Sequence, residues 1–147
     1  MILADAQATH DAGRALAPYL RAGDVIALSG DLGAGKTSFA RGVLDGLGLV
    51  EDAPSPSFAL VIAYAQPDVS LPVWHVDLYR LDAHDAFEQL GLDDALDDGA
   101  LIIEWPERMG ARLWPDALKL HFAPDDDGGR VLTVATSPSW KARCPLR

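Results

Sequence analysis

Several kinds of residue are scarce or missing in this 147-residue chain, and each absence excludes a class of protein. Cysteine occurs once, as Cys144 close to the end, so the chain can form neither an internal disulfide framework nor a site of several thiolates around one metal ion. Asparagine is absent, which excludes the Asn-Lys-x-Asp motif that reads guanine in GTP-binding proteins. No apolar run approaches the ~18 residues that a membrane-spanning helix needs.

Basic residues are also few. The chain has 12 lysines and arginines against 22 acidic residues, which gives a net charge of −10. An acidic surface repels the phosphates of nucleic acids, so we expect no autonomous binding to RNA or DNA. Residues 1–6 carry no basic residue ahead of a long apolar segment, which argues against a secretory signal and favours a cytoplasmic location without membrane association.

Hydrophobic residues make up 49% of the chain, which is enough to bury the core of one domain of ordinary size. The sequence contains no repeat, linker or low-complexity segment. We therefore expect a single domain over residues 1–137, followed by a C-terminal tail over residues 138–147 to which we assign no role.

The pattern of apolar residues predicts an α/β fold. A continuously apolar strand over residues 24–29 precedes a glycine-rich turn, and a helix with one apolar stripe follows from Lys36 to a terminating Gly48. An earlier helix is expected from its N-cap Thr9 to residue 22. Further strands are predicted over residues 58–64, 73–78, 100–103, 117–123 and 131–136, and a further helix over residues 83–97 with a break near Gly91. This order indicates a mixed sheet with flanking helices and a C-terminal antiparallel hairpin.

The strongest chemical signal is the run Gly-Asp-Leu-Gly-Ala-Gly-Lys-Thr at residues 30–37, which matches the P-loop pattern G-x-x-x-x-G-K-[ST]. Its glycines let backbone amides turn inward around a polyphosphate, and the helix that follows offers its positive N-terminal end. Lys36 is placed to reach the β- and γ-phosphates, and the Thr37 hydroxyl to ligate magnesium. Because the pattern lies between an apolar strand and an amphipathic helix, we expect a P-loop NTPase-like fold that binds ATP with Mg²⁺ rather than an ordinary glycine turn.

Two acidic residues follow apolar strand segments, where a P-loop protein needs a carboxylate for its metal. Glu104 ends the run Leu-Ile-Ile-Glu, and Asp77 follows Val76. A buried strand seldom ends in a carboxylate without a partner, because its desolvation is costly. Both residues are candidate metal ligands; the alternative is that each is a solvated strand end or a cap.

Three other residues carry weaker signals. Ser57, in the loop Ser-Pro-Ser, would bring a hydroxyl near the γ-phosphate as a switch loop does, or it is a turn residue. His75 is either a site residue or a strand histidine satisfied within the core. Trp105, next to Glu104, either forms a wall of the pocket or simply packs.

Four segments together resemble the TsaE (formerly YjeE) family of bacterial P-loop ATPases. They are residues 30–37, 55–58 (Ser-Pro-Ser-Phe), 75–81 (His-Val-Asp-Leu-Tyr-Arg-Leu) and 103–107 (Ile-Glu-Trp-Pro-Glu). The segments follow the family's order and spacing, and with the N-terminal helix the resemblance covers about residues 5–135. The P-loop is shared by many families, whereas the segments at residues 75–81 and 103–107 are much more specific to this one.

The resemblance implies a function in making threonylcarbamoyladenosine beside the anticodon of tRNA. Family members bind the TsaD–TsaB pair, and their ATP hydrolysis is thought to reset that complex, while TsaD performs the transfer to tRNA. At matching positions, the resemblance assigns catalytic roles to Lys36, Asp77, Glu104 and Ser57, and metal ligation to Thr37, Glu104 and Asp77. Ser57 stands where the family commonly has threonine, so the hydroxyl is kept and a methyl is lost. The residues expected to bind the nucleotide are Thr9, Asp31, Leu32, Gly33, Ala34, Gly35, Lys36, Thr37 and Ser38.

The sequence thus predicts an enzyme that hydrolyses ATP with the help of Mg²⁺. The main alternative is a small-molecule P-loop kinase, in which Arg108 and Arg112 would act as lid residues. The segments above leave little chain for an acceptor pocket and a lid, which argues against the kinase. A regulatory protein that binds nucleotide without turning it over is a third alternative.

Overall fold

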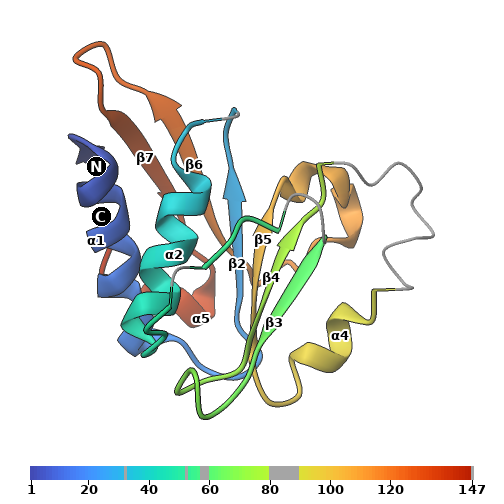
Figure 1. The fold of residues 1–147 in the computed structure, drawn as a ribbon. Helices are drawn as coiled ribbons and strands as arrows, with labels where there is room; N and C mark the ends of the chain where they lie inside the picture. The colour runs from blue at the N-terminus through green and yellow to red at the C-terminus, as the bar shows by residue number, and fades with distance from the viewer. Residues whose placement is uncertain (32, 52, 57–59, 80–89, 147) are drawn as a thin grey trace.

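The computed structural model describes residues 1–31, 33–51, 53–56, 60–79 and 90–146. Within this part of the chain, the strands form one seven-stranded sheet in the order β1-β7-β6-β2-β5-β4-β3 (Figure 1). The strands are β1 (Ile2–Leu3), β2 (Val25–Ser29), β3 (Val61–Tyr64), β4 (Val73–Asp77), β5 (Ala100–Glu104), β6 (Leu118–Pro124) and β7 (Arg130–Ala135).

The centre of the sheet is parallel and its edges are antiparallel. β2 pairs in parallel with both β5 and β6, and β4 pairs in parallel with β5. β3 runs antiparallel to β4, β7 to β6 and β1 to β7. Every residue of β5 and the first four of β2 are buried, as expected of central strands that are covered on both faces. The predicted mixed sheet with flanking helices and a C-terminal antiparallel hairpin is therefore confirmed.

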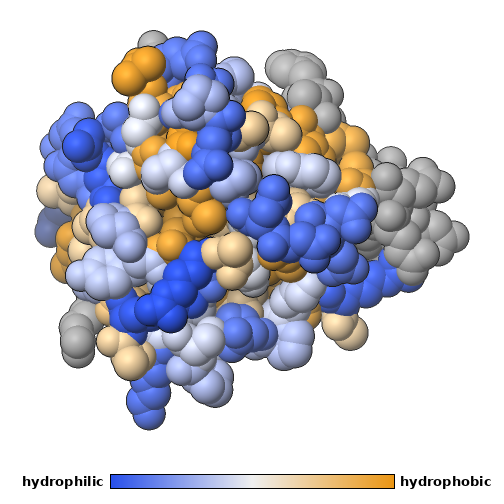
Figure 2. Space-filling view, turned by 90° about the horizontal axis from the view of Figure 1, so that it is seen from below, coloured by the Kyte–Doolittle hydropathy of each residue, from blue (hydrophilic) through white to orange (hydrophobic). Residues whose placement is uncertain are grey.

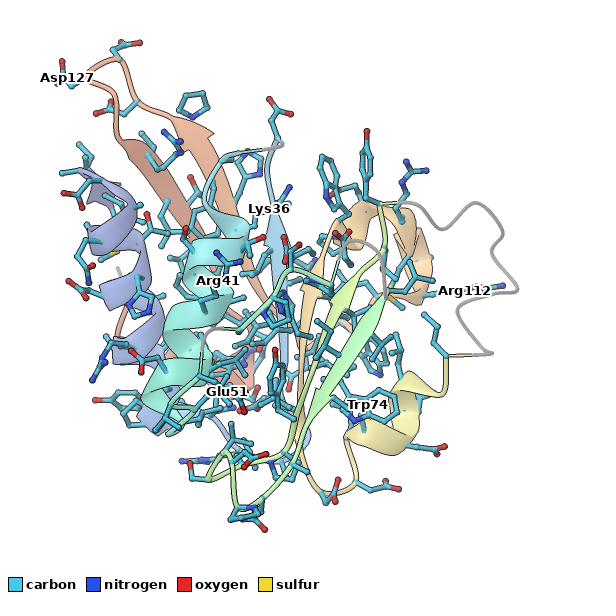
Figure 3. All side chains as sticks on the ribbon, in the orientation of Figure 1. Lys36, Arg41, Glu51, Trp74, Arg112 and Asp127 are labelled. Atoms are coloured by element: carbon cyan, nitrogen blue, oxygen red, sulfur yellow. The ribbon has the colours of Figure 1, made fainter. Side chains whose placement is uncertain are left out.

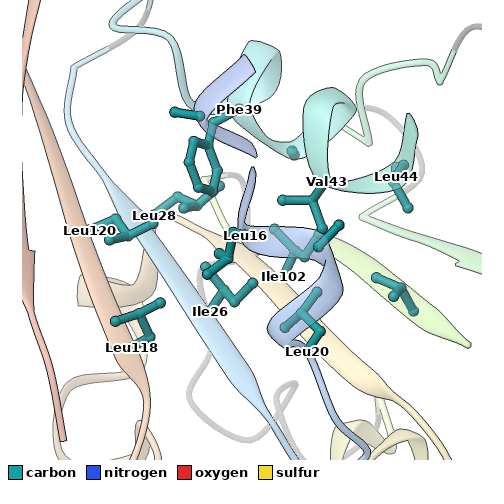
Figure 4. Packing of buried hydrophobic residues seen from close by; sticks show 14 of the residues in the cluster. Leu16, Leu20, Ile26, Leu28, Phe39, Val43, Leu44, Ile102, Leu118 and Leu120 are labelled. Carbon is teal, nitrogen blue, oxygen red and sulfur yellow. The ribbon is translucent and has the colours of Figure 1, made fainter. Parts of the chain in front are cut away.

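Helices α1 (Ala6–Leu16) and α2 (Lys36–Gly46) cover one face of the sheet (Figure 1). They pack closely because both carry glycine at the contact. A Cβ atom on Gly13 would collide with the carbonyl oxygen of Phe39, and one on Gly42 with that of His10. Beneath them lies the main core, whose buried side chains interlock between the helices and the strands (Figure 4). It includes Leu16, Leu20, Ile26, Leu28, Phe39, Val43, Leu44, Ile102, Leu118 and Leu120.

A second, smaller core lies on the other face of the sheet, because successive strand residues alternate between the faces. Val25, Leu101 and Ile103 bury their side chains there against the short helix α4 (Leu92–Ala95) and Met109. The chain near Met109 forms two single-turn 3₁₀ helices, η2 (Pro106–Arg108) and η3 (Gly110–Arg112). A similar turn, η1 (Ala17–Tyr19), continues α1. Both faces of the central strands are thus covered.

Residues 138–146, where the sequence predicts a tail, pack against the main core. They contain the short helix α5 (Pro138–Lys141), whose Trp140 is fully buried. Arg143 forms two hydrogen bonds to the Asp24 carboxylate, at 2.6 and 2.8 Å, and its guanidinium lies 3.7 Å from the centre of the Trp140 ring. The described part of this segment is therefore tied to the sheet at the start of β2.

Several element boundaries differ from the sequence-based predictions. The first helix begins at Ala6 rather than after Thr9, because the Asp5 carboxylate caps it by accepting a hydrogen bond from the Ala8 amide at 2.8 Å. Strand β1 was not predicted, since two residues are too few for a recognisable pattern. Of the helix predicted over residues 83–97, the structure shows α4, and the break predicted near Gly91 is confirmed, since this glycine precedes α4 in the left-handed region; residues 83–89 lie outside the described residues.

The predicted helix from Lys36 and its end are confirmed. Gly48 has a φ of 105°, the left-handed conformation that glycine favours just beyond a helix. Among the described residues, no helix combines the length and the apolar character needed to cross a bilayer. At the end of the molecule remote from the turn between β2 and α2, hydrophilic and hydrophobic residues are interspersed over the surface (Figure 2).

Candidate functional site

The turn between β2 and α2 lies at the carboxyl end of the central strand, where open α/β sheets bind their ligands. Gly30, Gly33 and Gly35 have φ values of 138°, 77° and 108°, which only glycine adopts readily. Among the described residues, no side chain caps α2, so none of them binds the amides of its first turn as a cap. These features make the loop of residues 30–37 suited to hold an anion at a helix N-terminus.

Lys36 begins α2 and lies at the upper end of the sheet in Figure 3. Only 4% of the residue is exposed. Its ammonium group donates hydrogen bonds to the carbonyl oxygens of Gly30 and Asp31, the second at 3.4 Å. It also lies over the Trp105 ring, 3.6 Å from the ring centre. The cation predicted to bind phosphate is thus held within the loop by carbonyl oxygens and an aromatic face.

Burial and neighbouring carboxylates shift the pKa of Lys36 in opposite directions. Burial lowers the pKa of the ammonium group below its ordinary value of 10.5. The carboxylates of Glu104, Glu107, Asp77 and Asp31 act in the opposite direction, with Glu104 contributing most of this group. The net shift is downward, so part of the stabilisation that a charged lysine normally receives from water is missing here.

The two candidate metal ligands lie side by side, as predicted for the ends of neighbouring strands. Asp77 and Glu104 face each other in the register of β4 and β5, and they are only 6% and 3% exposed. The Thr37 hydroxyl lies 3.2 and 3.4 Å from the two Glu104 carboxylate oxygens. One Asp77 oxygen accepts a hydrogen bond from the Tyr79 amide at 2.9 Å. Three predicted residues from three elements therefore meet at the P-loop.

His75 also joins this group. It is fully buried on β4, and its Nε2 atom lies 2.6 Å from a Glu104 carboxylate oxygen. In the described chain, no set of three or more histidine, cysteine or acidic side chains is arranged to hold a metal by itself. This donor set fits Mg²⁺, which proteins bind through one or two carboxylates while phosphates and water supply the remaining ligands.

A pocket of about 290 Å³ opens at this end of the sheet and joins the P-loop to residues from three other regions. Its walls are formed by the start of α1, the P-loop, the ends of β4 and β5, and the β6–β7 hairpin. The lining residues are Asp5, Ala6, Thr9, Gly33, Gly35, Lys36, Thr37, Ser38, Asp77, Glu104, Trp105, Gly128, Gly129 and Arg130. The volume is at the lower end of the range for small-molecule sites.

Most of the sequence-predicted nucleotide contacts lie in this pocket. Thr9 reaches it from α1, and a Cβ atom on Gly35 would lie only 3.3 Å from the Thr9 methyl group. Asp31 and Ala34 belong to the loop without lining the cavity. The predicted positions Leu32 and Ser57 lie outside the described residues.

The most notable residue that the sequence did not indicate is Arg130, the first residue of β7. Its guanidinium donates hydrogen bonds to the carbonyl oxygens of Gly33 and Gly129, each at 2.9 Å. This contact attaches the hairpin to the P-loop. No motif marks Arg130, and its position beside the loop follows only from the placement of β7 and β6 next to β2.

The arginines of the kinase alternative do not meet at the P-loop. Arg112 lines a different pocket, together with α4 and Trp114, on the other side of the sheet. Arg108 lies above the Tyr79 ring, 5.8 Å from the ring centre. The pocket described above thus contains no arginine from residues 106–112.

A glycine-rich loop between a central parallel strand and a helix, with two strand-end carboxylates beside its lysine and threonine, defines a P-loop protein. The model of one protein family matches residues 3–132 of this chain, and its description is "Threonylcarbamoyl adenosine biosynthesis protein TsaE". The chain belongs to this TsaE family. The resemblance inferred from four sequence segments is thereby confirmed.

Curated relatives support the same assignment. The proteins named "tRNA threonylcarbamoyladenosine biosynthesis protein TsaE" from Streptomyces coelicolor and Treponema pallidum are 42% and 35% identical to this chain. The first alignment covers 77% of each protein, and the second covers 88% of this chain and 95% of the relative. The crystal structure of Bacillus subtilis YdiB superposes with a TM-score of 0.78 at 28% identity, covering 95% of this chain and 86% of YdiB.

Proposed function

We propose that this protein binds ATP with Mg²⁺ and hydrolyses it as a component of the threonylcarbamoyladenosine modification of tRNA. The observation that carries the proposal is the convergence of Lys36, Thr37, Asp77 and Glu104 on one pocket at the P-loop. Family membership and the names of the relatives support the modification pathway.

The phosphates are bound by the loop of residues 30–37. Its amides and the N-terminus of α2 supply partial positive charge, and Lys36 supplies a full charge next to the β- and γ-phosphates. To reach them, the ammonium exchanges its carbonyl and indole contacts for phosphate oxygens. Thr9 and Arg130 border the same pocket from α1 and β7 and would contact the rest of the nucleotide.

Thr37, Glu104 and Asp77 would hold Mg²⁺, with Thr37 and Glu104 as the central pair because they already touch. When bound, the ion would neutralise charge on the phosphates and polarise the transferring phosphoryl group. The carboxylate of Asp77 is placed to support the metal or to orient the attacking water. We assign the switch role, a hydroxyl near the γ-phosphate, to Ser57.

In the reaction, the oxygen of a water molecule bonds to the γ-phosphorus while the bond from this phosphorus to the β–γ bridging oxygen breaks. Lys36 stabilises the charge that develops on the leaving oxygens. The water's proton passes to solvent or to a phosphate oxygen, and the products are ADP and inorganic phosphate. Burial lowers the pKa of Lys36 below its ordinary value in the free protein, and phosphate oxygens next to the ammonium would favour its charged form.

The partners are inferred from the family. We propose that the chain acts on the TsaD–TsaB complex, that its hydrolysis is slow without that complex, and that the partners, not this acidic chain, bind the tRNA. ATP is the expected nucleotide, since the chain has no asparagine for the guanine-reading motif.

The decisive experiment measures hydrolysis of ATP and of GTP by the purified protein, with and without TsaD–TsaB. We expect faster turnover of ATP in the presence of the pair. Lys36→Ala should abolish binding or turnover, and Lys119→Ala, which removes an exposed lysine of β6, should not. The proposal would be refuted if the Lys36→Ala variant turned ATP over at the wild-type rate. It would also be refuted if the rate were the same for ATP and GTP and the same with and without TsaD–TsaB.

A further inference from the structure

His75 and Glu104 form a buried pair whose role the proposed mechanism does not use. His75 lies two residues before Asp77 on β4, so both side chains point to the same face of the sheet. Its ring extends along that face to the end of the neighbouring strand, where Nε2 lies 2.6 Å from the Glu104 Oε2 atom. Neither side chain is more than 4% exposed.

The contact fixes the carboxylate from a second side. Thr37 Oγ1 lies near both Glu104 oxygens at 3.2 and 3.4 Å, a geometry that by itself leaves the carboxylate free to turn. The shorter contact from His75 engages Oε2 alone. Together they leave Oε1 with Thr37 and hold the plane of the carboxylate in one orientation.

The second ring nitrogen of His75 indicates that this histidine is present for its contact with Glu104. Its Nδ1 atom is buried without a hydrogen-bond partner among the described residues. A histidine that merely completed the core would satisfy both ring nitrogens or be replaced by an apolar residue, because a buried polar atom without a partner is costly. The tautomer with its proton on Nε2 donates to the carboxylate and leaves Nδ1 as the orphaned acceptor.

The geometry points to His75 as a positioning residue. It holds the Glu104 carboxylate in the orientation that faces Thr37 and the metal of the bound nucleotide, so that a ligand on a strand end is ordered before the nucleotide arrives. Outer partners of this kind fix the orientation of metal ligands, and their loss typically costs about 10- to 100-fold in metal affinity or activity. The metal part of this inference rests on the proposed function, whereas the orientation of Glu104 does not.

Two substitutions separate positioning from packing. His75→Leu keeps a similar volume and removes the donor, and His75→Gln keeps an N–H donor at a similar reach. Calorimetry with ADP, with Mg²⁺ and with a chelator in its place, measures metal-dependent and metal-independent binding separately. We expect His75→Leu to raise the Mg²⁺ concentration needed for half-maximal effect by about 10- to 100-fold. Its chelator-resistant affinity should stay within about threefold of wild type, and His75→Gln should recover most of the metal response.

The control is His10→Leu, which removes a histidine of α1 that faces Asp45 outside the pocket. It should leave both affinities unchanged. A folded His75→Leu variant with a wild-type Mg²⁺ response would overturn the inference. So would a leucine variant that loses chelator-resistant and Mg²⁺-dependent binding equally, or a glutamine variant no better than leucine.

Crystal structures of the nucleotide-free variants supply a readout that does not depend on the proposed function. We expect the Glu104 carboxylate to turn away from Thr37 in His75→Leu and to keep its place in His75→Gln. An unmoved carboxylate in the leucine variant would refute the positioning role, whatever the protein binds. If the wild type bound no nucleotide at all while Glu104 moved as expected, the proposed function would fail and the positioning of Glu104 would stand.

Discussion

Lys36 and Trp105 are in direct contact at the mouth of the P-loop, with the lysine ammonium 3.6 Å from the centre of the indole ring. Trp105 holds this position with a φ of 62°, an uncommon value for a residue other than glycine, and its ring packs on Tyr79 at a centroid distance of 4.8 Å. A cation over an indole face is attracted by about 0.5–2 kcal/mol. In the proposed function, this contact would compete with phosphate for the lysine and would break when the ammonium moved to the nucleotide.

This contact makes Trp105 a reporter of phosphate binding. We expect the tryptophan emission of the protein to change when magnesium–ATP is added, because the ammonium leaves the ring. Trp105→Phe should lose this change while calorimetry still detects binding. Trp114→Phe, which alters a half-buried ring in the other pocket, is the control and should retain the change. An equal response in both variants would show that the emission change does not arise at Trp105 and would contradict the prediction.

The lowered pKa of Lys36 predicts proton uptake on binding at alkaline pH. Burial, the largest cause, lowers this pKa below 10.5, so the free protein loses the proton at a lower pH than an exposed lysine does. Polyphosphate next to the amine favours the charged form and raises the pKa again. Binding should therefore take up protons through Lys36 in a pH window below 10.5.

Calorimetry in buffers of different ionisation enthalpy measures this uptake. The Lys119→Ala variant should show the same uptake as wild type, since this lysine is exposed on β6. Binding heats that are independent of the buffer across the alkaline window would contradict the assignment of Lys36 as the phosphate-binding cation.

The Thr37 hydroxyl is expected to carry metal dependence rather than nucleotide affinity as such. Thr37→Ser keeps the hydroxyl that touches Glu104, and Thr37→Val keeps the shape and removes it. Loss of a hydrogen bond to a charged group costs about 1.5–3 kcal/mol, so the valine variant should need about 10- to 100-fold more Mg²⁺ for hydrolysis. Wild-type protein treated with a chelator should lose its activity as well. Serine and valine variants with the same Mg²⁺ requirement would argue against ligation by this hydroxyl.

The sequence predicts those residues of the site that belong to recognisable local segments. Residues 30–37 define their own backbone geometry, and Glu104 and Asp77 end strands whose apolar character is plain. Parallel strands bring their carboxyl ends to one edge of the sheet, so the meeting of these residues could be expected before the structure was known. The family resemblance adds specificity because its segments cover the same strand ends.

The rest depends on which strands are neighbours, which no local pattern encodes. Arg130 reaches Gly33 only because the β6–β7 hairpin adds to the sheet next to β2. The pairing of His75 with Glu104 likewise depends on the register between β4 and β5. The start of α1 at Ala6 differs from the predicted start for another reason. Asp5 and Thr9 are both residues that favour an N-cap, so the sequence alone does not choose between them, and the structure shows Asp5 as the cap.

Arg130 is expected to support nucleotide binding by tying the hairpin to the P-loop. Arg130→Met keeps most of the side chain's apolar stem and removes the two hydrogen bonds to Gly33 and Gly129. At about 0.5–1.5 kcal/mol for each bond, the affinity for ATP should fall by about 10-fold. Arg112→Met, in the other pocket, serves as the matched control for the loss of one positive charge. Equal affinities of the two variants in calorimetry would exclude a role for Arg130 in the site.

The segment after Ser137 is expected to stabilise the fold. Trp140 is completely buried in the main core, and Arg143 covers its ring while binding Asp24 at the entrance to β2. Because β2 leads directly into the P-loop, this segment supports the strand that positions the site. Trp140→Ala should lower the free energy of unfolding by about 3–5 kcal/mol, a large part of the stability of a domain of this size. Lys141→Ala, an exposed change on the same helix, should cost less than about 0.5 kcal/mol. Urea denaturation of both variants measures the difference, and equal midpoints would mean that residues 138–146 are dispensable for the fold.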